Sequence, residues 1–151
     1  MASAPSAAEV LARVPQQDPF RFIDEILEID DDHVVATCTF RADADFYRGH
    51  FPGNPITPGV LLIEAMAQAG VVAQGLFIVA AAGGFEATEK LVTVFTDADV
   101  EFHGVVPPGA TVRIEGRKQY FRHGKLRARV EMTWDGRVVC SGTLAGMGVP
   151  R

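Results

Sequence analysis

The sequence predicts an α+β fold in which a curved antiparallel β-sheet wraps around one long central α-helix. Residues 58–82 are almost entirely Val, Leu, Ile, Ala, Met and Phe, and at ~1.5 Å per residue they would form roughly 37 Å of helix. The rest of the chain contains about six segments rich in β-forming residues, separated by turn residues. A helix that is apolar all round must be enclosed, and a curved sheet supplies that cover. Part of the helix would stay bare, which predicts dimerisation.

Residues at both ends of the apolar run favour these helix boundaries. Thr57 is a residue type that caps helix N-termini, and Pro58 suits the first helical position because its missing N–H is not needed there. At the other end, Gly83 and Gly84 can supply the C-terminal cap. The helix is therefore expected to begin at Pro58 and to end near Ala82.

Alternating hydrophobic residues and turn dipeptides define the expected strands. The acidic turn over residues 30–32 would join the first two strands into a hairpin, and Asp135-Gly136 is a strong signal for a second hairpin. His123-Gly124 indicates a further turn. The expected strands are residues 20–29, 33–41, 91–102, 111–121, 126–134 and 138–147, with a short helix over residues 9–14.

Length and composition indicate a single domain over residues 9–151, preceded by a flexible N-terminus over residues 1–8. A chain of 151 residues can bury a real core. Its 48% hydrophobic and 22% charged residues are ordinary for a soluble globular protein. The net charge of −5 and the lack of a Lys/Arg-rich run argue against nucleic-acid binding.

The cysteines and the polar residues of the helix predict a cytoplasmic protein that does not span a membrane. Cys38 and Cys140 lie in separate strand-like segments, with no CxxC partner and no secretory leader before them, so both are expected to be small buried hydrophobes in a reducing compartment. The apolar run is long enough to cross a membrane. Its polar residues Glu64, Gln68 and Gln74 weigh against that interpretation.

The segment 49–70, GHFPGNPITPGVLLIEAMAQAG, concentrates the residues suited to chemistry. His50 lies among Gly and Pro residues that fix an unusual backbone path and so aim its side chain. Glu64 and Gln68 are one helical turn apart on one face, in apolar surroundings where a polar group is costly unless it is used or satisfied. From these residues alone, His50 could be a structural hydrogen-bonder, Glu64 a locally satisfied buried carboxylate and Gln68 a local hydrogen-bonder.

The remaining histidines do not form a metal site. They fall at turns and at a strand end, where we expect them to lie on the surface, and the four histidines of the chain show no metal-ligand spacing. We therefore predict neither a metal nor a cofactor.

The segment 49–70 resembles the signature of the β-hydroxyacyl-acyl-carrier-protein dehydratases, the FabZ-type family. The resemblance extends to VPQQDPFRFID, FTDADVEFHGVVPPG and DGRVVCSGTLAG and covers most of the chain. It implies a hot-dog fold, a homodimer or a trimer of dimers, and an active site shared across the dimer. By the same resemblance, His50 corresponds to the catalytic histidine and Glu64 to the catalytic carboxylate contributed by the partner subunit. Glu64 in place of the Asp of FabA-type enzymes implies dehydration of (3R)-3-hydroxyacyl thioesters to trans-2-enoyl thioesters without an isomerase step.

The implied reaction needs two proton-transfer groups, one to remove a weakly acidic α-proton and one to assist a poor leaving group at the β-carbon. We expect His50 to be the base and Glu64, protonated in its apolar setting, to be the acid. Gln68 could orient that carboxyl group or a water. The N–H of Gly59 could stabilise negative charge on the thioester oxygen at the start of the helix. Phe51 and Phe20 are expected to line the acyl tunnel.

Departures from the family pattern bear on the carrier. Gln16-Gln17 stands where His-Arg is common, and His103-Gly104-Val105 replaces a Lys-Arg-Pro run. Acyl carrier proteins are acidic and are held by basic patches, so either a dedicated acyl carrier protein or a coenzyme A thioester fits this chain. A different basic patch could be formed by Arg48, Arg117, Lys118, Arg122, Arg127 and Arg129.

Two other functions stay open beside the dehydratase. A hot-dog thioesterase would hydrolyse the thioester with a helix carboxylate and water, although His50 in its full HFPG setting disfavours this. A non-catalytic acyl-carrier-binding subunit would be expected to lack His50 or Glu64, and this chain retains both.

Overall fold

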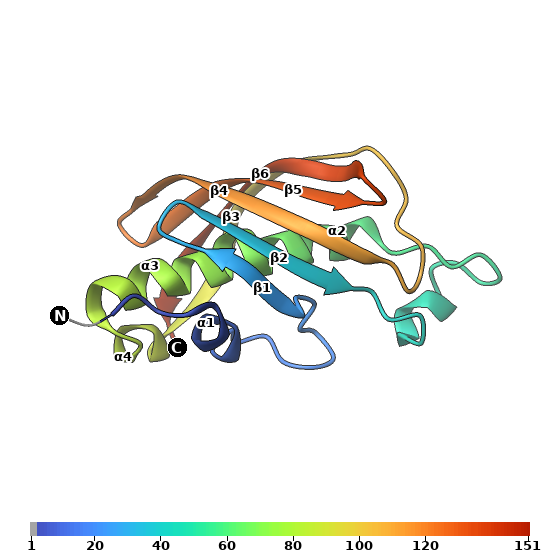
Figure 1. Ribbon diagram of the computed structural model, residues 1–151. Coiled ribbons are helices and arrows are strands. Elements are labelled where there is room, and N and C mark those ends of the chain that lie inside the picture. The colour runs from blue at the N-terminus through green and yellow to red at the C-terminus, as the bar shows by residue number, and fades with distance from the viewer. Residues whose placement is uncertain (1–2) are drawn as a thin grey trace.

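A computed structural model describes residues 3–151 as one antiparallel sheet curved around a long helix (Figure 1). The sheet has six strands in the order β1-β2-β4-β5-β6-β3, and every neighbouring pair is antiparallel. The helix crosses the concave face of this sheet. The predicted α+β architecture is therefore confirmed. The strands are β1 (Glu25–Ile29), β2 (His33–Thr39), β3 (Leu91–Phe102), β4 (Thr111–Arg122), β5 (Lys125–Trp134) and β6 (Arg137–Pro150).

Most strands follow the sequence prediction, and the turns between them do so closely. Strand β3 has the predicted bounds, and β1 and β2 form the predicted hairpin. At both other hairpin turns the two central residues adopt positive φ, with values of 51° and 78° at His123 and Gly124 and of 52° and 74° at Asp135 and Gly136. Turns of this hand match the twist of the flanking strands.

Two strand boundaries differ from the prediction because of contacts distant in sequence. Strand β1 begins at Glu25 rather than at residue 20, since the preceding residues hydrogen-bond to the helix through Gln68. Strand β6 continues to Pro150 because β3 pairs with it along its whole length, with Leu91 opposite Pro150. At the end of β2 the chain turns after Arg41, whose C=O accepts the N–H of Ala44 at 3.0 Å.

The central helix runs without interruption through three segments, α2 (Gly59–Ala67), the π-helical segment η2 (Gln68–Ala73) and α3 (Gln74–Gly83). Gly84, with φ of 79°, ends it as predicted. The predicted N-cap is wrong: Pro58 holds that position, and the Thr57 hydroxyl instead hydrogen-bonds the Tyr47 hydroxyl at 2.6 Å. This 25-residue helix is long and apolar enough to cross a membrane, but 72% of its most apolar window is buried inside this fold, as in the core helix of a globular domain.

Two short helices flank the sheet. Helix α1 (Ala7–Ala12) begins two residues before the predicted domain start, because Ser6 and Glu9 form a capping box in which each side chain accepts the other's backbone N–H. Met1 and Ala2 of the predicted flexible N-terminus lie outside the described residues, and the flexibility of this segment stays a prediction. Helix α4 (Glu86–Glu89) lies between the end of the central helix and β3, where the sequence predicted no helix.

Small residues bring the helix close to the sheet at its midpoint. A Cβ built on Gly70 would lie 2.6 Å from Cγ2 of Val130, and one on Gly116 would lie 3.0 Å from Cα of Gly70. A methyl group at Gly70 would force Val130 to shift, and one at Gly116 would press on the backbone of Gly70. The π-helical turn therefore rests directly on β4 and β5, and this contact fixes the height of the neighbouring helix residues above the sheet.

Strand β3 forms one edge of the sheet and carries exposed apolar residues. Val94, Phe95 and Phe102 are 44%, 48% and 51% exposed. The pairing of β3 with β6 shifts register between Phe95 and Asp97, and such bulges commonly re-aim side chains beside functional sites. A long apolar edge is a surface that proteins usually cover.

Candidate functional site

His50 lies in a loop that is closed on itself by backbone hydrogen bonds. Its C=O accepts the N–H of Ile56 at 2.9 Å, and further out Phe51 and Asn54 exchange two backbone hydrogen bonds of 3.1 and 2.9 Å. The loop is anchored at its base by the Thr57 hydroxyl on buried Tyr47 and by the Thr57 N–H on the C=O of Val106. The Gly- and Pro-rich segment thus holds the histidine in a fixed position, as the sequence indicates.

The hydrogen bond of the His50 ring fixes its tautomer. Nδ1 lies 2.9 Å from the C=O of Ile56. Because a carbonyl oxygen can only accept, Nδ1 carries the proton, and in the neutral ring the lone pair is then on Nε2. The ring of Phe51 stacks on the imidazole at a centroid distance of 4.1 Å. This arrangement prepares Nε2 to take up a proton.

Glu64 lies half-buried on α2, and Gln68 holds its carboxyl group. Nε2 of Gln68 donates to Oε1 of Glu64 at 3.0 Å. Burial raises the pKa of Glu64, and the hydrogen bond from Gln68 opposes this shift more weakly. A carboxyl group with a raised pKa holds its proton to higher pH, as a general acid near neutrality requires.

Gln68 also joins the helix to the segment before β1. It is fully buried, and besides Glu64 it contacts two backbone groups: its Nε2 donates to the C=O of Phe20 at 2.8 Å, and its Oε1 accepts the N–H of Phe22 at 2.9 Å. Both the NH₂ group and the carbonyl oxygen of the Gln68 side chain therefore have hydrogen-bond partners. Its predicted contact with Glu64 is observed. The two backbone contacts could not be predicted because they span more than forty residues.

Gly59 is the first residue of α2, at the positive end of the helix dipole. Among residues 3–151, no group accepts a hydrogen bond from its N–H. A Cβ at this position would lie 3.0 Å from the ring of Phe102. The glycine therefore leaves a free backbone donor beside an aromatic side chain of β3.

Glu64 opens into a small pocket, here called the Glu64 pocket, which His50 of the same chain does not line. The pocket is formed by Glu64 and by Gln16, Ala67, Val71, Val72, Thr93, Phe95 and Gly146. No hydrogen bond or ion pair within residues 3–151 joins His50 to Glu64. Within the described chain the two predicted proton-transfer groups therefore do not contact each other or share this pocket, and Glu64 lies beside the exposed edge strand.

Gln16 is a polar group of the Glu64 pocket that sequence reasoning noted only as a departure from the family pattern. Its Oε1 is buried and has no hydrogen-bond partner among residues 3–151. Buried polar atoms are nearly always hydrogen-bonded. This acceptor is available to an N–H or O–H group that enters the pocket.

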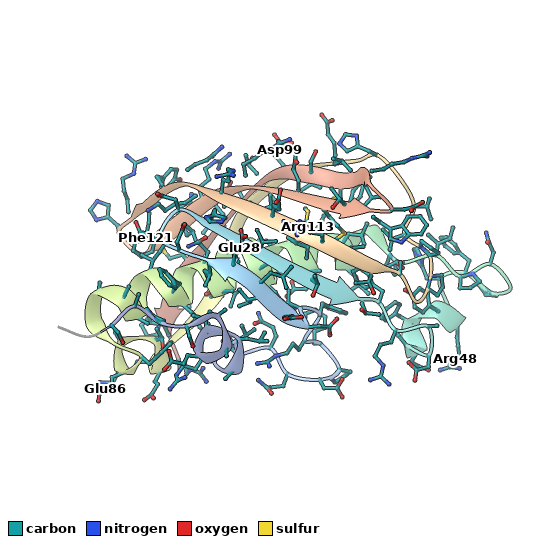
Figure 2. The ribbon with its side chains drawn as sticks, in the orientation of Figure 1. Glu28, Arg48, Glu86, Asp99, Arg113 and Phe121 are labelled. Atoms are coloured by element: carbon teal, nitrogen blue, oxygen red, sulfur yellow. The ribbon has the colours of Figure 1, made fainter. Side chains whose placement is uncertain are left out.

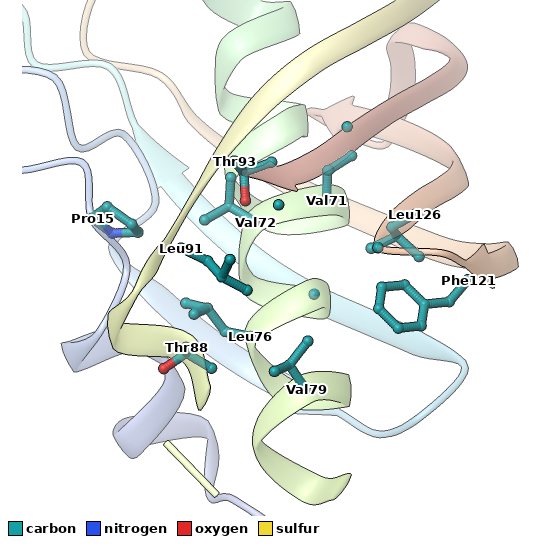
Figure 3. A pocket seen from close by; sticks show the side chains of 14 residues that line it. Pro15, Val71, Val72, Leu76, Val79, Thr88, Leu91, Thr93, Phe121 and Leu126 are labelled. Atoms are coloured by element: carbon teal, nitrogen blue, oxygen red, sulfur yellow. The ribbon is translucent and has the colours of Figure 1, made fainter. Parts of the chain in front are cut away.

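A larger apolar cavity, here called the inner cavity, lies next to the Glu64 pocket and borders α3 (Figure 3). Its volume is about 80 Å³. The two spaces share Val71, Val72, Thr93 and Gly146, which we call the neck. Sequence reasoning placed an acyl tunnel along the helix but did not identify these residues.

Phe20 and Phe51 do not line either of these two spaces in the described chain. Phe51 is 49% exposed and borders a shallow hollow beside η1 (Asp45–Arg48), and Phe20 is 48% exposed and packs edge-on against Phe22. Their role in lining an acyl tunnel stays a prediction.

The residues of the predicted basic patch do not all lie together. Arg48 belongs to η1 (Figure 2), where it pairs with Asp45. The other five residues lie on β4 and β5. Lys118 pairs with Asp31 and Asp32, and Arg127 with Asp97. Arg117 faces Arg129 across the β4–β5 ladder. Of the predicted patch this leaves the exposed arginine pair, beside which Glu115 faces Glu131 in the same ladder.

The other predicted side chains lie largely as expected. Cys38 and Cys140 are fully buried, as predicted, and burial raises the pKa of the Cys140 thiol to about 11. His123 is exposed, while His33 is a quarter exposed and bonds Glu28 and Asp30. Within residues 3–151 no group of three or more His, Cys, Asp or Glu residues is placed to hold a metal ion.

Comparison with known proteins identifies the family. Residues 14–143 match the FabA-like domain. The chain is 37% identical over 138 residues to 3-hydroxyacyl-(acyl-carrier-protein) dehydratase FabZ of Acetivibrio thermocellus, covering 90% of this chain and 89% of that protein. Identity to the FabZ dehydratase of Roseiflexus castenholzii is also 37%, covering 90% of this chain and 91% of that protein. The FabZ dehydratase of Escherichia coli O9:H4 is 33% identical, with coverage of 90% and 87%.

Solved structures share the fold at low sequence identity. The dehydratase heterocomplex ApeI:P of Xenorhabdus doucetiae superposes with a TM-score of 0.70 at 16% identity, covering 94% of this chain and 91% of the other. A mutant of thioesterase PA1618 from Pseudomonas aeruginosa gives 0.68 at 14% identity, with coverage of 99% and 97%. The hot-dog fold implied by the sequence is thereby confirmed. With this fold and with the match across most of its length, the chain belongs to the FabA-like family and groups with its FabZ-type dehydratases.

Proposed function

We propose that this protein dehydrates (3R)-3-hydroxyacyl thioesters, carried on an acyl carrier protein, to trans-2-enoyl thioesters. The observation that carries the proposal is the His50 ring, whose Nδ1–H is held by the C=O of Ile56 so that Nε2 is left as a base. Family membership supports the same reaction. Neither a cofactor nor a metal is required, since both steps are proton transfers.

In the proposed reaction, Nε2 of His50 removes the proton from the α-carbon of the substrate. The electron pair of that C–H bond forms the double bond to the β-carbon, and the C–O bond at the β-carbon breaks. Glu64 gives its proton to the departing hydroxyl group, which leaves as water. The reaction ends with His50 protonated and Glu64 ionised, and solvent exchange restores both groups.

Three further groups support these steps. The free N–H of Gly59, at the positive end of α2, can donate to the thioester oxygen while negative charge develops on it. Gln68 holds the Glu64 carboxyl group through the 3.0 Å bond. Oε1 of Gln16, which lacks a partner within residues 3–151, can accept a hydrogen bond from the β-hydroxyl group or from a water in the same pocket.

We propose that the complete site forms between two copies of the chain, with His50 from one and Glu64 from the other. Within one chain the two residues lie in separate places, and Glu64 opens beside the apolar edge of β3. Pairing of two β3 edges would cover Val94 and Phe95 and bring the two helices together. Assembly of such dimers into a trimer of dimers stays a prediction.

Two observations support an acyl carrier protein as the carrier of the substrate: the names of the relatives and the charged residues on the sheet. The FabZ relatives are named for acyl-carrier-protein substrates. The arginine pair Arg117 and Arg129 offers a positive surface for an acidic carrier, although a coenzyme A thioester would also supply negative phosphates. We place the reaction in the cytoplasm, as the free cysteines predict.

Absorbance of the conjugated enoyl thioester tests the reaction directly. Wild-type protein should interconvert 3-hydroxyacyl and enoyl thioesters, whereas His50→Ala and Glu64→Gln should each lose roughly 10²–10⁴-fold in kcat/KM, the usual share of a general acid or base. Circular dichroism verifies that both variants fold. Release of free thiol without enoyl interconversion would favour a thioesterase instead. Absence of both signals on carrier-linked and coenzyme A substrates would leave the binding subunit as the alternative.

Mixing the two inactive variants tests the shared site. Co-expressed His50→Ala and Glu64→Gln chains should regain about a quarter of wild-type activity, because half of randomly paired dimers are mixed and each mixed dimer has one intact site. A mixture that stays as inactive as its parents would contradict a site shared between subunits while leaving the reaction itself untouched.

A further inference from the structure

Three polar side chains line the Glu64 pocket, and they differ in what they can still bind. They belong to Gln16, Glu64 and Thr93. Oε1 of Glu64 already accepts a hydrogen bond from Gln68, whereas Oε1 of Gln16 is buried and has no partner among residues 3–151. Buried polar oxygens are nearly always hydrogen-bonded in folded proteins. The amide oxygen of Gln16 is therefore the acceptor of this pocket that most needs a donor.

The backbone around Gln16 is held by the side chain of Arg21. Nε of Arg21 donates to the C=O of Gln16 at 2.9 Å, and Nη2 donates to the C=O of Val14 at 2.7 Å. Because the guanidinium group is planar and rigid, two such bonds fix the positions of both carbonyl groups. Val14 is itself anchored in the core, with 1% of its surface exposed. Arg21 thus determines where the side chain of Gln16 begins.

The same segment is joined to Glu64 through Gln68. Backbone groups of Phe20 and Phe22, on either side of Arg21, bond the side chain of Gln68. Gln68 in turn donates to Glu64 at 3.0 Å. Gln16 and Glu64 are distant in sequence, but one hydrogen-bonded unit positions both of them, and such a unit keeps its members in a defined geometry.

The β-hydroxyl group of the proposed substrate needs the acceptor that Gln16 supplies. A hydroxyl group has one proton to donate and two lone pairs with which to accept. In the proposed reaction Glu64 donates to the β-oxygen, so the hydroxyl proton requires a second group as its acceptor. An amide oxygen can fill this role at every pH. Unlike a cationic group, a neutral amide does not favour ionisation of the carboxyl group beside it.

We propose that Gln16 binds the β-hydroxyl group of the substrate through Oε1 and that Arg21 is the positioning residue that holds Gln16 for this contact. The inference rests on the proposed function, which places the hydroxyl-bearing carbon at Glu64. The site then distinguishes a 3-hydroxyacyl thioester from the saturated acyl thioester of the same length by one hydrogen bond. Gln16 stands where His is common in the family, so the amide contact is a feature of this chain.

Binding to an inactive protein tests this contact without turnover. In the His50→Ala background, calorimetry compares (3R)-3-hydroxybutyryl coenzyme A with butyryl coenzyme A, which differ only in the hydroxyl group. Gln16→Met keeps the length of the side chain and removes the acceptor. It should weaken binding of the hydroxylated thioester roughly 2–13-fold, the effect of one neutral hydrogen bond, and leave butyryl binding unchanged. Gln119→Met makes the same replacement at an exposed position of β4 and should change neither.

Arg21→Met tests the positioning role, because it removes both donors and keeps the apolar stem. It should reduce the preference for the hydroxylated thioester in the same way. Added to Gln16→Met it should cause no further loss of that preference, since Arg21 acts on the hydroxyl group only through Gln16; additive losses would overturn this role. With His50 intact, both single variants should raise KM for the 3-hydroxyacyl substrate and leave KM for the enoyl substrate unchanged, whereas a folding defect would affect both substrates.

Three results would overturn the contact itself. Equal weakening of both thioesters by Gln16→Met would show that Gln16 only packs in the pocket. No change in either, or no preference in the parent protein, would show that Oε1 does not bind the hydroxyl group. A preference that survives Gln16→Met and is lost in Thr93→Val would assign the hydroxyl group to Thr93. Absence of enoyl interconversion by the wild-type protein would instead overturn the proposed function, and the inference with it.

Discussion

The two halves of the central helix have nearly the same apolar composition but different environments. Helix α2 and the turn after it carry Glu64 and Gln68, which are hydrogen-bonded to each other. Gln68 is also hydrogen-bonded to the backbone before β1. Helix α3 carries Gln74, which makes one hydrogen bond, from Nε2 to the C=O of Asp30, while its Oε1 has no partner among residues 3–151. Beyond Gln74 the helix borders the inner cavity.

This difference indicates that the two halves of the central helix have different functions. A hydrogen-bonded polar network holds a carboxyl group in a defined position, which suits proton transfer. An apolar wall without such a network suits the binding of an alkyl chain. The π-helical segment Gln68–Ala73 lies between the two regions, in keeping with the frequent occurrence of π-turns at functional sites.

Removing each glutamine in turn gives the largest effect expected from this comparison. Gln68→Ala leaves the Phe22 N–H and the Phe20 C=O without their partner, and we expect it to lose roughly 1–3 kcal/mol more in unfolding free energy than Gln74→Ala. Gln68→Ala should also lower kcat, because Glu64 loses its hydrogen bond. Urea unfolding and the enoyl absorbance assay measure the two effects.

Gln74→Ala is the matched control, since both glutamines are fully or almost fully buried and the same volume is removed. Equal losses of stability in the two variants would show that the additional hydrogen bonds of Gln68 contribute nothing.

Alanine at two glycines of the same helix should change stability in opposite directions. At Gly70 the new Cβ would lie 2.6 Å from Val130, and overpacking of this kind costs roughly 1–3 kcal/mol. At Gly75 the nearest atom is 3.8 Å away, so Gly75→Ala should gain roughly 0.4–1 kcal/mol from reduced freedom of the unfolded chain. Thermal unfolding measures both, and destabilisation of the same size at both positions would contradict the described spacing between helix and sheet.

The smallest effect is a dependence of stability on pH at Glu64. Burial raises the folded-state pKa of this carboxyl group, so ionisation favours the unfolded state, in which the pKa is ordinary. The penalty is absent at pH values below the unfolded-state pKa and grows as pH rises toward the raised folded-state pKa. Glu64→Gln should therefore gain stability relative to wild type over that interval and keep the gain at higher pH.

Urea unfolding of both proteins across an acid-to-neutral series measures this difference. A difference that does not change with pH would contradict a raised pKa at Glu64. The comparison is made between the two proteins at each pH, so that the other carboxyl groups, which are common to both, cancel.

Local sequence determined much of this fold. The apolar run predicted the central helix to within a residue or two, Gly84 ended it, and β3 has the bounds that its residues predict. Asp135-Gly136 formed the expected hairpin turn. These features depend on backbone preferences and side-chain periodicity among near neighbours, which the sequence displays directly. The same segment supplied His50 and Glu64 as candidates, and the loop that holds His50 follows from its own Gly and Pro residues.

Tertiary structure decided what depends on contacts between distant segments. Thr57 bonds Tyr47 instead of capping the helix, and Phe20 and Phe22 are held by Gln68 rather than by a neighbouring strand. The neighbouring positions of the Glu64 pocket and the inner cavity require β3, β6 and the helix to lie side by side. Sequence periodicity states which face of an element is apolar, but the space between two such faces depends on how closely they approach. Here that approach was determined by single glycines, Gly70 and Gly146, whose importance appears only when their partners across the core are known.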